Sequence, residues 1–118
     1  MSVRVLQDLP VGKLENAVPT AYRAMTDALP NKTPNVTLLL FRSSKGDVIL
    51  SRVVKRGLEK LPKKGQETRI AIGGCFTAES EALLRKYAFE VLYLSDLHWT
   101  DDAYISLRGA PRDVDMEL

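Results

Sequence analysis

The sequence almost lacks two residue types that carry metal and redox chemistry: its 118 residues include one cysteine, Cys75, and one histidine, His98. A single cysteine excludes an internal disulfide and any cysteine-rich zinc site. No apolar run approaches the roughly 20 residues that a membrane-spanning helix requires, and the opening MSVRVLQDLPVGK is not a signal peptide. These absences predict a cytoplasmic protein without a membrane partner.

The chain as a whole has no large excess of positive or negative charge, but two of its segments do. The net charge is +2, yet residues 42–69 carry nine basic and three acidic side chains, a local net charge of +6. Residues 96–118 carry two basic and six acidic side chains, a local net charge of −4. The basic middle of the chain is therefore the part whose composition points to a partner.

Three short apolar runs, at residues 36–41, 70–72 and 91–94, indicate strands that are covered on both faces. Amphipathic helical patterns separate them, and this alternation predicts parallel pairing through right-handed crossovers. A hydrophobic content of 45% in a chain of this length supports one core and one domain, residues 1–118. We expect an α/β fold with a small, mainly parallel sheet of three or four strands, flanking helices and a βαβαβ core at residues 35–96.

The helix expected between the first two strands has an N-cap at Asp47 and ends before Pro62. Its period separates an apolar face from a basic one. The apolar face consists of Leu50, Val53, Val54, Leu58 and Leu61. In the following helix, Thr77 is the expected N-cap, and the inner face consists of Leu83, Leu84, Tyr87 and Ala88. The glycines of the GGCFT segment before this helix are interpreted as close packing or a strand-end kink.

The two ends of the chain are less strongly patterned. Residues 1–9 are interpreted as a short strand, with a loose arm as the alternative, and residues 11–29 as a helix whose regular part begins near Asn16 or Val18 because of Pro19. This helix or a partner subunit is expected to cover one face of the sheet. Residues 110–118 are expected to form an acidic, mobile tail. A sheet this small has exposed edges, which favours a homodimer.

The basic face of the first crossover helix, together with its flanks, forms the candidate site for binding a DNA or RNA backbone. Its residues are Arg42, Lys45, Arg52, Lys55, Arg56, Lys60, Lys63 and Lys64. The alternative is an ordinary solvated helix face. Few aromatic residues are interleaved with these charges, so stacking on single strands is not expected.

Other residues point less strongly to a catalytic, metal or interaction site. Cys75 and His98 could form a nucleophile and its base, but a buried structural thiol is the favoured interpretation. Asp96 and His98, with two further aspartates at 101 and 102, match the spacing of no specific metal site. Trp99 is interpreted as a plug over the sheet end or as part of an interface. No catalytic residue, metal or cofactor is assigned.

The run RIAIGGCFTAESEALLRKYAFEVLYLSDL resembles the C-terminal half of restriction-endonuclease-like domains of the Mrr type. The matching residues are Gly74, Phe76, Thr77, Glu79, Glu90, Leu92, Asp96 and Leu97. The resemblance implies a DNA-cleaving fold in which an Asp and an E/Q-x-K pair hold Mg²⁺ and assist a water.

The strand that should carry that pair departs from the family pattern. It reads LLLFRSS, with Leu39 or Leu40 at the ligand position and Phe41 or Arg42 at the lysine position. The resemblance therefore implies a reduced member that retains backbone binding without hydrolysis. From the sequence we expect a non-catalytic nucleic-acid-binding module, with a homodimeric protein–protein interaction module as the alternative.

Overall fold

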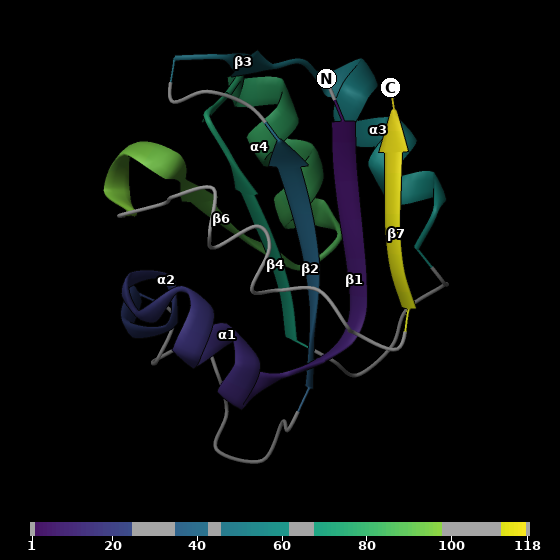
Figure 1. The fold of residues 1–118 in the computed structure, drawn as a ribbon. Coiled ribbons are helices and arrows are strands. Elements are labelled where there is room, and N and C mark those ends of the chain that lie inside the picture. Colours follow the sequence, from purple (N-terminus) through teal and green to yellow (C-terminus); the bar gives the residue numbers. More distant parts are fainter. Residues whose placement is uncertain (1, 25–34, 43–45, 62–67, 98–111, 118) are drawn as a thin grey trace.

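A five-stranded mixed sheet forms the centre of the protein, as seen in a computed structural model that describes residues 2–24, 35–42, 46–61, 68–97 and 112–117 (Figure 1). Its strands are β1 (Ser2–Pro10), β2 (Asn35–Arg42), β4 (Thr68–Gly73), β6 (Phe89–Tyr93) and β7 (Arg112–Glu117), in the order β6-β4-β2-β1-β7. The strands β2, β4 and β6 pair in parallel, which the sequence predicted. The pairs β1·β2 and β1·β7 are antiparallel, so the expectation of a mainly parallel sheet of three or four strands was wrong in these details.

Helices lie on both faces of the sheet (Figure 1). The helices α1 (Val11–Ala17) and α2 (Pro19–Ala24) cover one face, and α3 (Ser51–Glu59) and α4 (Ala78–Lys86) cover the other. Because β2 lies between these layers, Leu38, Leu39 and Leu40 are all fully buried. The helical segment after β1 thus covers the face that the crossover helices leave open, as expected.

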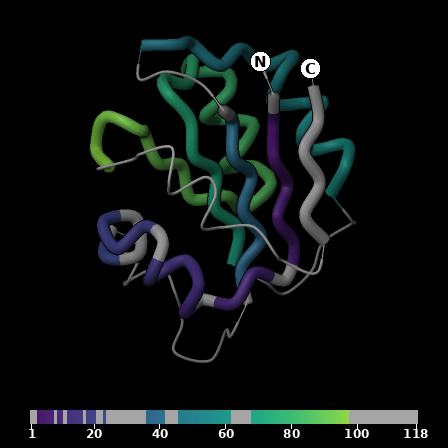
Figure 2. The backbone as a smooth tube through the Cα atoms, viewed as in Figure 1, coloured from purple at the N-terminus to yellow at the C-terminus, as the bar shows by residue number. Residues whose placement is uncertain are grey.

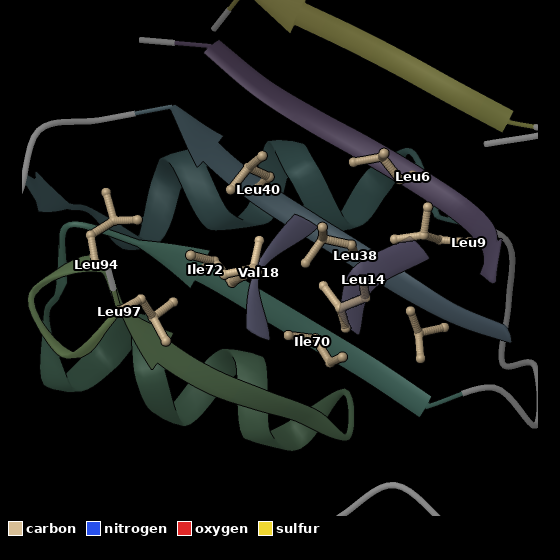
Figure 3. Close-up of a cluster of buried hydrophobic side chains, with 11 residues drawn as sticks. Leu6, Leu9, Leu14, Val18, Leu38, Leu40, Ile70, Ile72, Leu94 and Leu97 are labelled. Atoms are coloured by element: carbon tan, nitrogen blue, oxygen red, sulfur yellow. The ribbon is translucent and has the colours of Figure 1, made fainter. Parts of the chain in front are cut away.

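The first core cluster lies between the sheet and α1 (Figure 3). It contains Leu6, Leu9, Leu14, Val18, Val36, Leu38, Leu40, Ile70, Ile72, Leu94 and Leu97. A register shift between Leu6 and Leu9 lets both side chains face this cluster despite the odd spacing between them. The second cluster, under α3 and α4, includes Val5, Phe41 and Leu84.

The chain segments around the helices correct three expectations. The segment expected as one helix is divided into two, because α1 starts at Val11 and ends at Ala17 and Pro19 begins α2. The part of the expected helix at residues 25–29 lies outside the described residues. Residues 48–49, expected inside a helix capped by Asp47, form the short strand β3 (Val48–Ile49), which pairs in parallel with β5 (Cys75–Phe76). The helix α3 consequently begins at Ser51.

The strand β7 replaces the mobile acidic tail that we expected. The register places Val114 opposite Val5, Met116 opposite Val3 and Asp115 opposite Arg4. Residues 113–117 alternate acidic and apolar types, which is the period of a strand with one covered face. The two ends of the described chain therefore lie side by side, with Ser2 opposite Glu117 (Figures 1 and 2).

Candidate nucleic-acid interface

The position of α3 is set by its apolar side, which packs on β2. Val54 is fully buried, and Gly57 lies so close to the sheet that a Cβ there would be 3.2 Å from Leu39 Cδ1. A glycine in mid-helix costs about 1 kcal/mol of helix propensity, but here it allows the helix to approach β2. This close approach fixes which side of α3 faces solvent.

The solvent side of α3 carries the basic residues that the helical period predicted. Arg52, Lys55, Arg56 and Lys60 are all exposed. Within the described residues none of the four side chains makes an ion pair or hydrogen bond. Glu59, also exposed, lies on the same side of the helix. We refer to these four cations as the α3 basic face.

The structure brings together only part of the predicted basic surface. Arg42 ends β2, but its side chain, together with Lys45, Lys63 and Lys64, lies outside the described residues. These four therefore stay predictions, as do the roles of His98 and Trp99, which also lie outside the described part of the chain. The α3 basic face is the part of the candidate site that the structure describes.

A groove of about 300 Å³ separates α3 from α4. Its lining residues are Lys55, Leu58, Glu59, Leu83 and Tyr87. The two leucines are partly buried and give the groove an apolar floor, whereas the Tyr87 side chain is 46% exposed. The sequence pattern had placed Tyr87 on the buried side of its helix, and the structure corrects this.

The backbone around Tyr87 explains its exposure. Its N–H donates to the Leu84 carbonyl oxygen at 3.1 Å, and Arg69 Nη1 donates to the Tyr87 carbonyl oxygen at 3.3 Å. The next residue, Ala88, has a φ of 64°, which is a left-handed conformation uncommon for a residue other than glycine. Helix α4 thus ends at Lys86, and the helical period no longer determines where Tyr87 points.

The first turn of α4 is joined to β3 by a short network of hydrogen bonds. Thr77 caps α4 as predicted, because its Oγ1 accepts from the Ser80 N–H at 3.1 Å. The Thr77 hydroxyl donates to Ser80 Oγ, and the Ser80 hydroxyl donates to the Ile49 carbonyl oxygen, both at 2.8 Å. A second hollow of about 340 Å³ lies beside this network and is lined by Leu50, Ser51, Arg52, Thr77 and Glu79.

One carboxylate on α4 has two hydrogen-bond donors. Tyr93 Oη donates to Glu81 Oε2 at 2.8 Å, and Arg85 Nη2 donates to Glu81 Oε1 at 2.9 Å. The bonds from Arg85 and Tyr93 lower the pKa of Glu81 below its usual value. Partial burial, and then the bond to the carboxylate, raise the pKa of Tyr93. This arrangement fixes a structural contact between α4 and β6.

Cys75 is exposed at the start of β5, so the interpretation of a buried structural thiol was wrong. The backbone pairing with Val48 points Phe76 into the core and leaves Cys75 outside it. The glycine preceding this segment, Gly73, does pack closely, since a Cβ there would lie 2.7 Å from the Phe76 ring.

The centre of β2 is apolar and enclosed. Leu39, Leu40 and Phe41 are fully buried in β2. Among the residues that the structure describes, no three His, Cys, Asp or Glu side chains lie together in a way that could hold a metal ion. None of the helices in the described ranges is both long enough and apolar enough to span a membrane.

Comparison with protein-family models, with curated proteins and with solved structures found no match.

Proposed function

We propose that this chain is a non-catalytic module that binds a nucleic-acid backbone through the α3 basic face. The observation that carries the proposal is the exposure of four basic side chains, Arg52, Lys55 and Arg56 on α3 and Lys60 directly after it. None of these side chains has an ion-pair or hydrogen-bond partner within the described residues. Cations whose side chains form no ion pair attract phosphodiesters, because each contact releases condensed counterions from the nucleic acid. The proposal of a reduced nuclease-like fold without hydrolysis rests on the apolar residues Leu39 and Leu40 at the ligand positions.

A titration with labelled duplex DNA and duplex RNA at two salt concentrations tests this proposal. The logarithm of the binding constant should fall linearly with the logarithm of the salt concentration, with a slope of about −0.9 for each phosphate neutralised. Replacing Arg52, Lys55 and Arg56 with alanine should make that slope shallower by about 2 to 3. Incubation with Mg²⁺ followed by electrophoresis should leave the nucleic acid intact.

Arg23 on α2 provides a matched control. It is an exposed arginine on the opposite side of the sheet from α3. Arg56→Ala should weaken binding and reduce the salt slope, whereas Arg23→Ala should change neither. Equal effects of the two substitutions, or no binding at low salt, would refute the proposal, and cleavage in Mg²⁺ would refute its non-catalytic part.

A second proposal, from a different class, is contact between two copies of the chain through the β3–β5 ribbon. Val48 in β3 and Leu50 directly after β3 are large apolar residues that are 51% and 42% exposed. In the described part of the chain each of its two short strands pairs only with the other. Sedimentation equilibrium would show a dimer that Leu50→Ser weakens; a monomer at all concentrations would rule this out.

A further inference from the structure

We infer that the groove between α3 and α4 takes an unpaired nucleobase, stacked on Tyr87, so that single-stranded nucleic acid binds more tightly than duplex. The inference rests on the proposed function and specifies its ligand. Sequence patterns did not predict stacking, because few aromatic residues are interleaved with the basic residues along the chain. Folding places Tyr87 of the α4 end across the groove from Lys55 of α3.

The exposure of Tyr87 sets it apart from the other aromatic side chains that the structure describes. Phe41, Phe76 and Phe89 are buried, and Tyr93 is partly buried and bonded to Glu81. Tyr87 is 46% exposed, and within the described residues its ring stacks on no other aromatic ring. Its backbone is held at both its N–H and its carbonyl oxygen, so the ring is presented from a fixed point. An exposed, anchored ring beside cations is the arrangement that stacks single-stranded bases.

The lining of the groove suits a base better than a phosphate. Leu58 and Leu83 form an apolar floor, and Glu59 adds a carboxylate that repels phosphate but accepts hydrogen bonds from the exocyclic amino group of a base. Lys55 lies on the groove wall, and Arg56 lies one residue further along the exposed side of α3. A strand can therefore lay a base in the groove while its phosphates contact the α3 basic face. A base inside a duplex cannot, because its faces are already stacked.

The test compares oligodeoxycytidine with a mixed-sequence duplex of equal length. Tyr87→Ala should weaken binding of the single strand roughly ten-fold or more, because stacking of one base on an aromatic ring has about this effect. It should leave duplex binding unchanged. Tyr87→Phe keeps the ring and should retain single-strand binding, whereas Arg56→Ala should weaken both ligands. Because the Tyr87 side chain is half exposed, the alanine variant leaves no core cavity, and circular dichroism verifies its fold.

The outcomes separate the inference from the proposal beneath it. If neither ligand binds at low salt, the proposed function fails and the inference fails with it. If both bind but Tyr87→Ala affects neither, or affects both equally, the inference alone is overturned. Loss of single-strand binding in Tyr87→Phe as well would also overturn it, since the phenyl ring retains the stacking surface.

Discussion

The hydroxyl of Ser80 donates a buried hydrogen bond of 2.8 Å to the carbonyl oxygen of Ile49, across 31 positions of sequence. This bond ties the first turn of α4 to β3, the segment that leads directly into α3. The Thr77 N–H also approaches the same carbonyl oxygen, at 3.4 Å. The relative placement of the two helices, and with it the groove between them, depends on this contact.

Ser80→Ala should destabilise the protein by about 1–3 kcal/mol, because it removes a buried donor and leaves the Ile49 carbonyl oxygen with only the long bond from Thr77. Urea unfolding followed by circular dichroism would measure the change. Ser95→Ala is the control, since Ser95 is exposed and should have little effect. Equal midpoints for the wild type and Ser80→Ala would show that the bond contributes nothing.

Gly73→Ala should destabilise by about 1–3 kcal/mol, because the new methyl group would lie 2.7 Å from the Phe76 ring and 3.3 Å from Ile49 Cγ1. Contacts of the Phe76 ring with Phe41 and Tyr93, both T-shaped, oppose its displacement. Thermal unfolding would measure the loss. Gly12→Ala in α1 is a matched control: nothing lies within 4 Å of its Cβ position, so stability should be unchanged or rise by up to about 1 kcal/mol. A stable Gly73→Ala protein would contradict the packing described.

Glu81 should make stability depend on pH in the acid range. Its pKa in the folded protein is lowered below the usual 4.5, so the unfolded chain binds a proton more readily than the folded one does. The contribution is therefore complete above about pH 4.5 and is lost as the pH falls through the lower, folded pKa. Denaturant unfolding between pH 3 and pH 6 should show a shallower decline for Glu81→Gln than for the wild type. Glu79→Gln, an exposed neighbour in the same turn, should keep the wild-type profile; a wild-type profile in Glu81→Gln would count against this assignment.

Cys75 should react with a thiol reagent in the native protein, because its side chain is exposed. Labelling with a chromogenic disulfide should reach one thiol per chain without denaturant, and Cys75→Ser should remain unlabelled. A requirement for denaturant would show that the thiol is enclosed.

Sequence patterns predicted those parts of the fold that depend on local period. The apolar runs correctly indicated β2, β4 and β6, and Thr77 identified the start of α4. The strand β7 was missed because its acidic residues outweighed the alternation of Val114 and Met116 with them. The two-residue strand β3 is too short to leave a periodic signal, so its residues were assigned to the helix.

Sequence patterns also predicted part of the geometry of the candidate site. The 3.6-residue period correctly placed Arg52, Lys55 and Arg56 on the exposed side of α3. The groove could not be derived, because it results from packing between helices distant in sequence. Tyr87 was assigned to the buried side because the helical period was extended to Ala88, whose left-handed conformation ends the pattern. The sequence signal that could have pointed to this site was the position of Tyr87, an aromatic residue just before β6.

The position of β1 between β2 and β7 has a consequence for how the chain reaches this structure. One edge of β1 pairs with residues 35–42. The other edge pairs with residues 112–117, which follow their partners in β1 by more than a hundred positions. During synthesis on the ribosome, that second edge stays uncovered until the intervening segments have been made. Contacts so far apart slow folding, and an unpaired edge is open to wrong pairing with another nascent chain. We therefore expect truncation before β7 to produce a chain that aggregates and binds chaperones.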